Sequence, residues 1–167
     1  MGRGKLAARL AVAGLCAAAA TAALAQGDPA RRGEYLVTIM DCAGCHTEGA
    51  LAGRPDPALR LAGSAVGFGA PGLGVFYPRN LTPDRETGLG EWGEADIVRA
   101  LRTGERPDGR VLAPMMPWRS YAALTDEDAL AVAAYLKGLP PVRHAVPPPA
   151  GPGQRPPAPY LGVVSPE

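Results

Sequence analysis

Apolar side chains recur at helical spacing in three segments of the chain, which predicts three main α-helices. The first helix is expected to begin at Pro29 or Ala30 and to end near Asp41, because proline suits the first turn of a helix. Gly33, close to its start, would permit another helix to approach closely. The apolar surface of this helix would be formed by Leu36, Val37, Ile39 and Met40.

The second predicted helix covers residues 94–103. Glu94 and Asp96 lie at its amino-terminal end, where the helix dipole favours negative charge, and Gly104 follows as a stop signal. Its buried face would be formed by Ile97, Ala100 and Leu101.

The third predicted helix has the clearest boundaries. Thr125 is a good N-cap with Asp128 three residues later, and Gly138 and Pro140 end the helix. The face to be buried would be formed by Val132, Tyr135 and Leu136.

The segment from 49 to 93 is rich in glycine and proline and has little periodicity, so it is predicted to form loops. A loop region of this length is unusual in a compact domain. A large prosthetic group inside the domain, with the loops wrapped around it, would explain it.

The first 25 residues have the pattern of a secretory signal peptide. Arg3, Lys5 and Arg9 precede an apolar run that closes on the small-x-small sequence of residues 23–25, which predicts cleavage before Gln26. A retained membrane anchor is the alternative, but the run from 10 to 25 is about 16 residues, shorter than the ~20 that usually span a bilayer. A lipoprotein anchor at Cys16 is disfavoured because Leu15 precedes the cysteine. We therefore predict an exported, periplasmic protein.

Three regions follow from these patterns: a signal peptide at 1–25, one folded domain at 26–139 and a proline-rich tail at 140–167. The tail holds ten of the nineteen prolines, a composition that favours extended chain over a packed core. A disordered tail is therefore expected. The alternative is a strap that docks onto a partner or onto the domain itself.

The charge and the cysteine content of the chain exclude two classes of protein. Removal of residues 1–25 leaves 14 basic and 16 acidic residues, a net charge of −2, so nucleic-acid binding has no electrostatic basis. The same cleavage leaves Cys42 and Cys45 as the only cysteines. Two cysteines this close do not form a disulfide-stapled scaffold.

Residues 42–46 read Cys-Ala-Gly-Cys-His, the CxxCH pattern of covalent haem attachment. Each thiol can form a thioether with a haem vinyl group, and His46 then lies under the iron as the proximal ligand. A zinc site would need more ligands, since His144 is the only other histidine. A redox-active thiol pair is the remaining alternative, but the βαβ pattern expected around it is absent.

A sixth iron ligand is available in the turn Pro-Met-Met-Pro-Trp at 114–118. Methionine usually fills cores, but a rigid proline-bounded turn between two helices can direct Met115 or Met116 at a central group. A thioether ligand would raise the reduction potential of the iron.

The chain from about 33 to 139 resembles the class I cytochromes c, and most closely the haem domains in cytochrome subunits of periplasmic dehydrogenases such as the membrane-bound alcohol dehydrogenases. The resemblance rests on RGEYL at 32–36, NLTPD at 80–84 with ETGLGEW at 86–92, DG at 108–109, MPW at 116–118, Tyr121, and LTDED at 124–128 leading to AYL at 134–136.

The resemblance implies an all-α class I cytochrome c fold, with three main helices and long loops wrapped around one covalent haem c. It implies that Met116 is the axial ligand, and that Gly33 and Tyr135 lie where the first and last helices cross. Multi-haem subunits of that family repeat this domain, whereas this sequence has one CxxCH. The implied protein is a single-haem relative whose redox partners cannot be carried over.

The expected function is single-electron transfer without catalysis. The protein would serve as a soluble carrier or as the electron-acceptor subunit of a dehydrogenase. Its electron donor would be a dehydrogenase, and its electron acceptor would be a cytochrome or an oxidase. Association with a membrane complex is a further possibility. A haem enzyme or ligand sensor with an open sixth position is the alternative, but the only histidine available as a distal acid–base residue is His144, in a tail that is not expected to pack. Candidate partners of the haem propionates are Trp92, Trp118, Tyr77 and Arg79.

Overall fold

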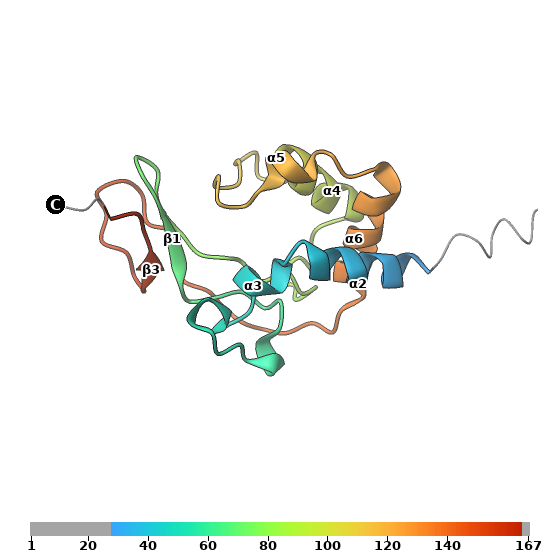
Figure 1. The fold of residues 1–167 in the computed structure, drawn as a ribbon, viewed down its shortest axis with the longest axis horizontal. Helices are drawn as coiled ribbons and strands as arrows, with labels where there is room; N and C mark the ends of the chain where they lie inside the picture. The colour runs from blue at the N-terminus through green and yellow to red at the C-terminus, as the bar shows by residue number, and fades with distance from the viewer. Residues whose placement is uncertain (1–27, 165–167) are drawn as a thin grey trace, which may run out of the picture.

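The computed structural model describes residues 28–164, so the expected signal peptide and Cys16 lie outside the described residues. Three helices form the main part of the domain, and two short helices and a small sheet lie beside them (Figure 1). No helix among residues 28–164 is long and apolar enough to cross a membrane. The helices are α2 (Pro29–Ile39), α3 (Cys42–His46), α4 (Glu94–Thr103), α5 (Trp118–Tyr121) and α6 (Asp126–Gly138), with 3₁₀ turns η1 (Ala50–Ala52) and η2 (Pro57–Leu59), and the strands are β1 (Gly67–Ala70), β2 (Gly74–Phe76) and β3 (Tyr160–Leu161).

The main helices begin and end close to the positions predicted from their capping residues. The Asp28 carboxylate accepts a hydrogen bond from the Ala30 amide at the start of α2, and the Thr125 hydroxyl accepts one from the Asp128 amide at the start of α6. Helix α2 ends two residues before Asp41, which adopts a left-handed conformation (φ 52°). This residue redirects the chain into α3.

Helices α2 and α6 cross at Gly33, as the resemblance implied. A Cβ atom on Gly33 would lie 2.0 Å from the Ala131 carbonyl oxygen and 2.6 Å from Cβ of Tyr135, so only glycine permits this approach. Arg32 binds Asp128 through two hydrogen bonds of 2.8 and 3.1 Å near the same ends of the helices. Side chains from α2, α3, α4 and α6 form the core around this crossing, among them Leu36, Val37, Cys42, Ile97, Leu101, Val132 and Leu136.

Residues 140–164 of the proline-rich tail are ordered, so the prediction of a disordered tail was wrong, and the alternative of a strap on the domain itself describes them. In Figure 1 the tail, orange to red, leaves the end of α6, passes below α3 and ends beside β1. Strand β3 pairs with β1 in parallel, and β1 pairs with β2 in antiparallel order, which gives the sheet order β2-β1-β3. The helical domain therefore carries a small sheet that the tail completes.

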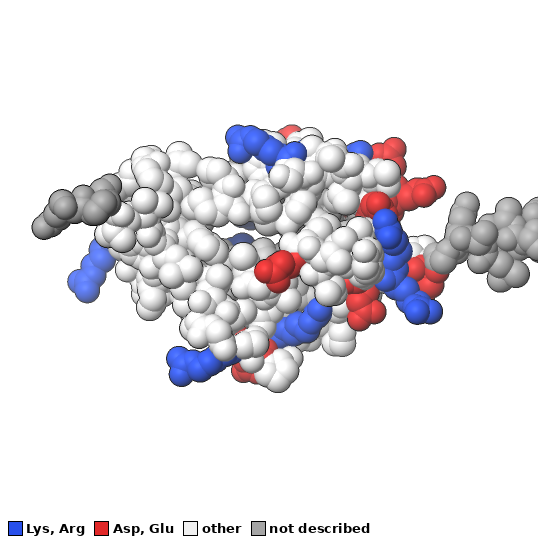
Figure 2. Space-filling view, in the orientation of Figure 1, with Lys and Arg blue, Asp and Glu red and all other residues white. Residues whose placement is uncertain are grey.

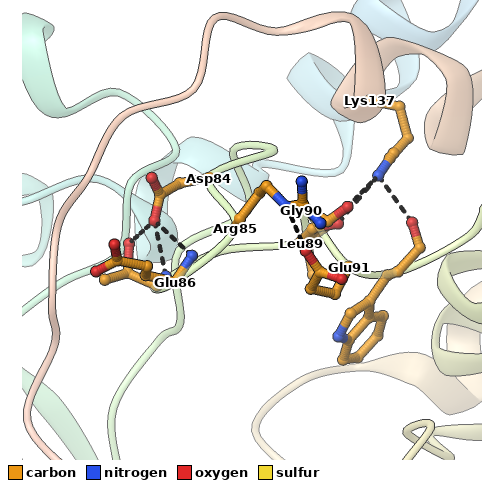
Figure 3. A network of polar contacts seen from close by, with 9 residues as sticks. Asp84, Arg85, Glu86, Leu89, Gly90, Glu91 and Lys137 are labelled. Carbon is orange, nitrogen blue, oxygen red and sulfur yellow. Dashed lines mark hydrogen bonds and ion pairs between the residues drawn. The ribbon is translucent and has the colours of Figure 1, made fainter.

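Lys137 connects the end of α6 to the loop that precedes α4. Its Nζ donates hydrogen bonds to the carbonyl oxygens of Leu89, Gly90 and Trp92, at 3.1, 3.1 and 2.8 Å (Figure 3). The ammonium group has three donors, so this side chain uses its full hydrogen-bonding capacity on one loop.

We expect Lys137→Met to lower the free energy of unfolding by about 2 kcal/mol, because hydrogen bonds to a charged group are lost while the apolar stem is kept. Guanidinium denaturation of the purified protein measures this. Arg99→Met, at an exposed residue paired with Asp96, is the control and should change stability by less than about 0.5 kcal/mol. Equal losses in the two variants would contradict this role of Lys137.

Asp84 organises the preceding turn. Its carboxylate accepts hydrogen bonds from the Thr87 hydroxyl and amide, both at 2.7 Å, and from the Glu86 amide at 3.2 Å (Figure 3). The bonds from Thr87 hold the pKa of Asp84 below its ordinary value of 3.8.

A carboxyl group with a lowered pKa stabilises the fold above its unfolded pKa, and this stabilisation is lost as pH falls through the folded pKa. We therefore expect Asp84→Asn to reduce the decline of stability between about pH 5 and pH 2. Guanidinium midpoints measured across this range test the expectation. Glu34→Gln, at an exposed position on α2, is the control. An unchanged pH dependence of stability in Asp84→Asn would contradict the expectation.

Candidate functional site

The two cysteines of the CxxCH pattern lie on the short helix α3. Cys42 is buried, Cys45 is half-buried, and neither forms a disulfide. Burial raises the pKa of the Cys42 thiol to about 11 and also raises that of Cys45. Because the thiolate is the reactive form in thiol–disulfide exchange, this environment is unfavourable for a redox-active thiol pair.

The local geometry of α3 depends on Asp41 and Gly44. The Gly44 amide donates to the Asp41 carbonyl oxygen at 3.1 Å, and a Cβ on Gly44 would lie 2.3 Å from the Asp41 carboxylate. A side chain at this position would have to displace the Asp41 carboxylate from where it lies beside α3. The turn presents Cys42, Cys45 and His46 within one short helix.

His46 is held in one orientation by a backbone carbonyl group. Its Nδ1 lies 2.7 Å from the carbonyl oxygen of Arg79, which can only accept, so Nδ1 carries the hydrogen. Burial lowers the pKa of His46, which favours the neutral ring. In that tautomer Nε2 has a free lone pair, the state needed of a metal ligand, and the hydrogen bond at Nδ1 increases its basicity.

Met115 and Met116 lie in the turn before α5, on the other side of a furrow from α3. Figure 2 shows this furrow between the lobe of α4 and α5 and the lobe that contains α3 and β1. The Met116 side chain packs against the core cluster that includes Cys42, whereas Met115 belongs to neither hydrophobic cluster of the described residues. This difference favours Met116 over Met115 as the side chain directed inward.

Two buried polar atoms have no hydrogen-bond partner among the described residues: Nε of Arg106 and Nε1 of Trp118. An unpaired buried donor is costly, which indicates that an acceptor from outside the polypeptide belongs here. Arg106 was missed in the sequence analysis, because an arginine in the turn around Asp108 carries no recognisable pattern. Trp118 was among the predicted propionate partners.

An excess of positive charge surrounds these atoms. The pKa of Arg79 is lowered by partial burial and by the nearby charges of Arg106 and Arg110. Both of these arginines pair with Asp108, at 3.2 and 2.7 Å. Two of these three guanidinium groups share one carboxylate, so the cluster has a net positive charge that an anionic ligand would neutralise.

Two other predicted propionate partners have different surroundings. The Tyr77 hydroxyl donates to the Ala158 carbonyl oxygen at 2.7 Å and accepts from the Ala158 amide at 3.1 Å, so the tail already uses it. The Arg106 guanidinium carbon lies 5.9 Å from the centroid of the Trp92 ring, and this ring also packs against the core. Trp92 therefore supports Arg106 by a cation–π contact.

The site fits a haem group. Cys42 and Cys45 have free thiols for thioether bonds, and His46 has one nitrogen free for iron. The unpaired donors of Arg106 and Trp118, in positively charged surroundings, suit propionate carboxylates. A helical domain with a CxxCH helix, a methionine-containing turn and such a site defines a c-type cytochrome.

Comparison with known proteins supports this class directly. The cytochrome c family model matches residues 30–140. The chain belongs to the cytochrome c family, and its helices adopt the class I cytochrome c fold together with the small sheet. Its function is that of an electron-transferring haem domain.

Several relatives are cytochrome subunits of dehydrogenases. The cytochrome c subunit of gluconate 2-dehydrogenase from Pantoea cypripedii is 39% identical over 116 residues, covering 69% of this chain and 24% of that protein. The cytochrome c subunit of quinone alcohol dehydrogenase from Gluconobacter oxydans (strain 621H) is 38% identical over 139 residues, covering 83% and 27%. A "Diheme cytochrome c-type" protein of Cereibacter sphaeroides is 34% identical over 116 residues, covering 70% and 38%. The chain thus spans about a quarter of the length of the two dehydrogenase subunits.

Proposed function

We propose that this chain is a periplasmic single-haem cytochrome c that accepts electrons from a dehydrogenase and passes them to a further redox protein. The observation that carries the proposal is the state of His46, whose Nδ1 is committed to the Arg79 carbonyl group and whose Nε2 is free. In this proposal Cys42 and Cys45 would hold the haem, and His46 and Met116 would ligate its iron. The bound haem iron would supply one-electron chemistry by cycling between its ferric and ferrous states.

The remaining site residues orient the group and balance its charge. The Arg79 carbonyl oxygen fixes the orientation of the His46 ring, and Arg106 and Trp118 would donate to the propionates. Met116 supplies a thioether sulfur, which stabilises the ferrous state and raises the potential. No residue in this arrangement has to act as an acid, a base or a nucleophile, so the role is transfer and not catalysis.

The donor assignment is supported by the names of the relatives, which are subunits of gluconate, alcohol and other dehydrogenases. The single haem is supported by the one CxxCH of this sequence, and the periplasmic location by the predicted signal peptide. The chain would act as a soluble carrier or as the acceptor subunit of such an enzyme.

The test is expression in a bacterium that attaches haem in its periplasm. We expect one haem per chain, resistant to denaturing electrophoresis, and reversible reduction by one electron. Cys42→Ala and Cys45→Ala together should abolish the covalent attachment, whereas Ser64→Ala, another small buried substitution, should leave it intact. A periplasmic wild-type protein without covalent haem would refute the proposal.

A further inference from the structure

The tail binds the loops behind His46 over most of its length. Its contacts fall on two segments, 61–67 and 75–87. Each segment is linked to His46 by a hydrogen bond, the first through the Gly63 amide and the second through the Arg79 carbonyl oxygen. We use the name tail strap for residues 140–161. Its hydrogen bonds join Val142 with Asn80 and Thr82, His144 with Thr87 and Ala62, Pro147 with Arg79, Ala150 with Val75, Ala158 with Tyr77, and Pro159 with Gly67. Arg143 adds an ion pair with Glu86.

The strongest of these contacts lie on either side of Arg79. Before it, Tyr77 exchanges two hydrogen bonds with Ala158, at 2.7 and 3.1 Å. After it, the Asn80 amide group donates to the Val142 carbonyl oxygen at 2.7 Å. The short segment between these two anchors carries the carbonyl group that accepts from His46.

Asn80 makes the second anchor rigid. It is almost completely buried, at 1% exposure, and its amide also donates to the Thr87 hydroxyl at 2.9 Å. Its side-chain oxygen accepts from both the amide and the hydroxyl of Thr82, at 2.9 and 2.8 Å. All hydrogen-bonding positions of this side chain are therefore in use, and one of them depends on the tail.

A second line of contacts reaches His46 from the other segment. Nδ1 of His144 lies 3.0 Å from the Ala62 carbonyl oxygen, and the next amide, that of Gly63, donates to the His46 carbonyl oxygen at 2.9 Å. Val146 packs so closely on Gly63 that a Cβ there would lie 2.5 Å from its Cγ1. The tail thus supports the main chain of His46 as well as the acceptor of its ring.

We propose that the tail strap is a positioning element for His46 and that it sets the reduction potential of the domain, an inference that rests on the proposed role of His46 as an iron ligand. The basicity of a ligating imidazole depends on the hydrogen bond at its other nitrogen. The Arg79 carbonyl group makes its 2.7 Å contact from a segment that the tail holds on both sides, in addition to the hydrogen bonds of Pro78 with Ser64 and of Leu81 with Leu61. Loosening the strap would weaken the hydrogen bond between His46 and Arg79. His46 would then donate its Nε2 lone pair to the iron less strongly, and the reduction potential would rise.

This role also accounts for the direction of the tail contacts. The polar groups at Val142, His144, Ala150 and Ala158 are directed at the domain, where they satisfy buried partners. A strap that served to bind another protein would leave these tail groups free for that partner. It would also leave the buried groups of the domain unpaired, which is costly.

The decisive variant is Tyr77→Phe, which removes the Ala158 anchor and keeps the ring. Tyr160→Phe is the matched control, because Tyr160 is half exposed and its hydroxyl has no hydrogen bond among the described residues. A chain ending at Gly153 removes the same anchor together with β3 and keeps Val142, His144 and Ala150. The haem-loaded proteins are compared by redox titration and by NMR of the His46 ring.

We expect the potential to rise in Tyr77→Phe, to rise further in the shortened chain and to stay at the wild-type value in Tyr160→Phe. The Nδ1 proton of His46 should exchange faster with solvent in the same order, a change that general loss of stability in distant parts would not follow. An unchanged potential and an unchanged exchange rate in Tyr77→Phe would overturn the inference, whether or not the shortened chain folds. A wild-type protein without covalent haem would instead refute the proposed function.

Discussion

Replacement of Met116 by alanine is expected to abolish the weak methionine–iron charge-transfer band of the oxidised protein and to convert its low-spin spectrum to one of an open or water-bound site. The reduction potential should fall by on the order of a few tenths of a volt, because axial ligands alone span roughly 0.8 V. The thioether of Met116 stabilises the ferrous state, and alanine offers no donor in its place. Visible spectroscopy and redox titration of the periplasmic protein measure both effects.

Met115→Ala is the matched control, since it removes the same side chain one position earlier in the same turn. It should keep the charge-transfer band and change the potential little, because Met115 does not contact the core cluster around Cys42. If Met115→Ala lost the band and Met116→Ala kept it, the ligand assignment would be reversed. A wild-type spectrum that is high-spin would point to an open sixth position and to a haem enzyme or sensor.

The helices were predictable from the sequence because each has local signals at both ends. Asp28, Thr125 and Gly104 act through hydrogen bonds or backbone conformations within one turn of the helix they bound. The crossing at Gly33 followed from the resemblance to class I cytochromes c. Its physical reason, the close approach of the Ala131 carbonyl group, is visible only in the folded chain.

The order of the tail was not predictable from its composition. Proline-rich chain cannot form a helix or a central strand, and this property suits a disordered segment and an extended strap equally. The deciding contacts join residues about 60 to 80 positions apart, such as Asn80 with Val142 and Tyr77 with Ala158. For the same reason Arg106 was missed, since its unpaired donor is a property of the site and not of the local sequence.

Gly33→Ala is expected to lower the free energy of unfolding by about 3 kcal/mol, at the upper end of the usual overpacking range. The new methyl group would lie 2.0 Å from a backbone carbonyl oxygen, which cannot move aside without separating α2 from α6. This loss outweighs the gain of up to ~1 kcal/mol that alanine brings to a helix over glycine. Guanidinium denaturation of the haem-loaded protein gives the value.

Gly138→Ala provides the control for helix propensity, because Gly138 is also helical and a Cβ there would meet nothing within 4 Å. We expect this variant to be neutral or to be stabilised by up to about 1 kcal/mol. The contrast between the two alanines separates the effect of the crossing from that of the residue type. Equal stability of Gly33→Ala and Gly138→Ala would contradict this prediction. It would mean that α2 and α6 can move apart at no cost, and that the core around Cys42 does not depend on their close contact.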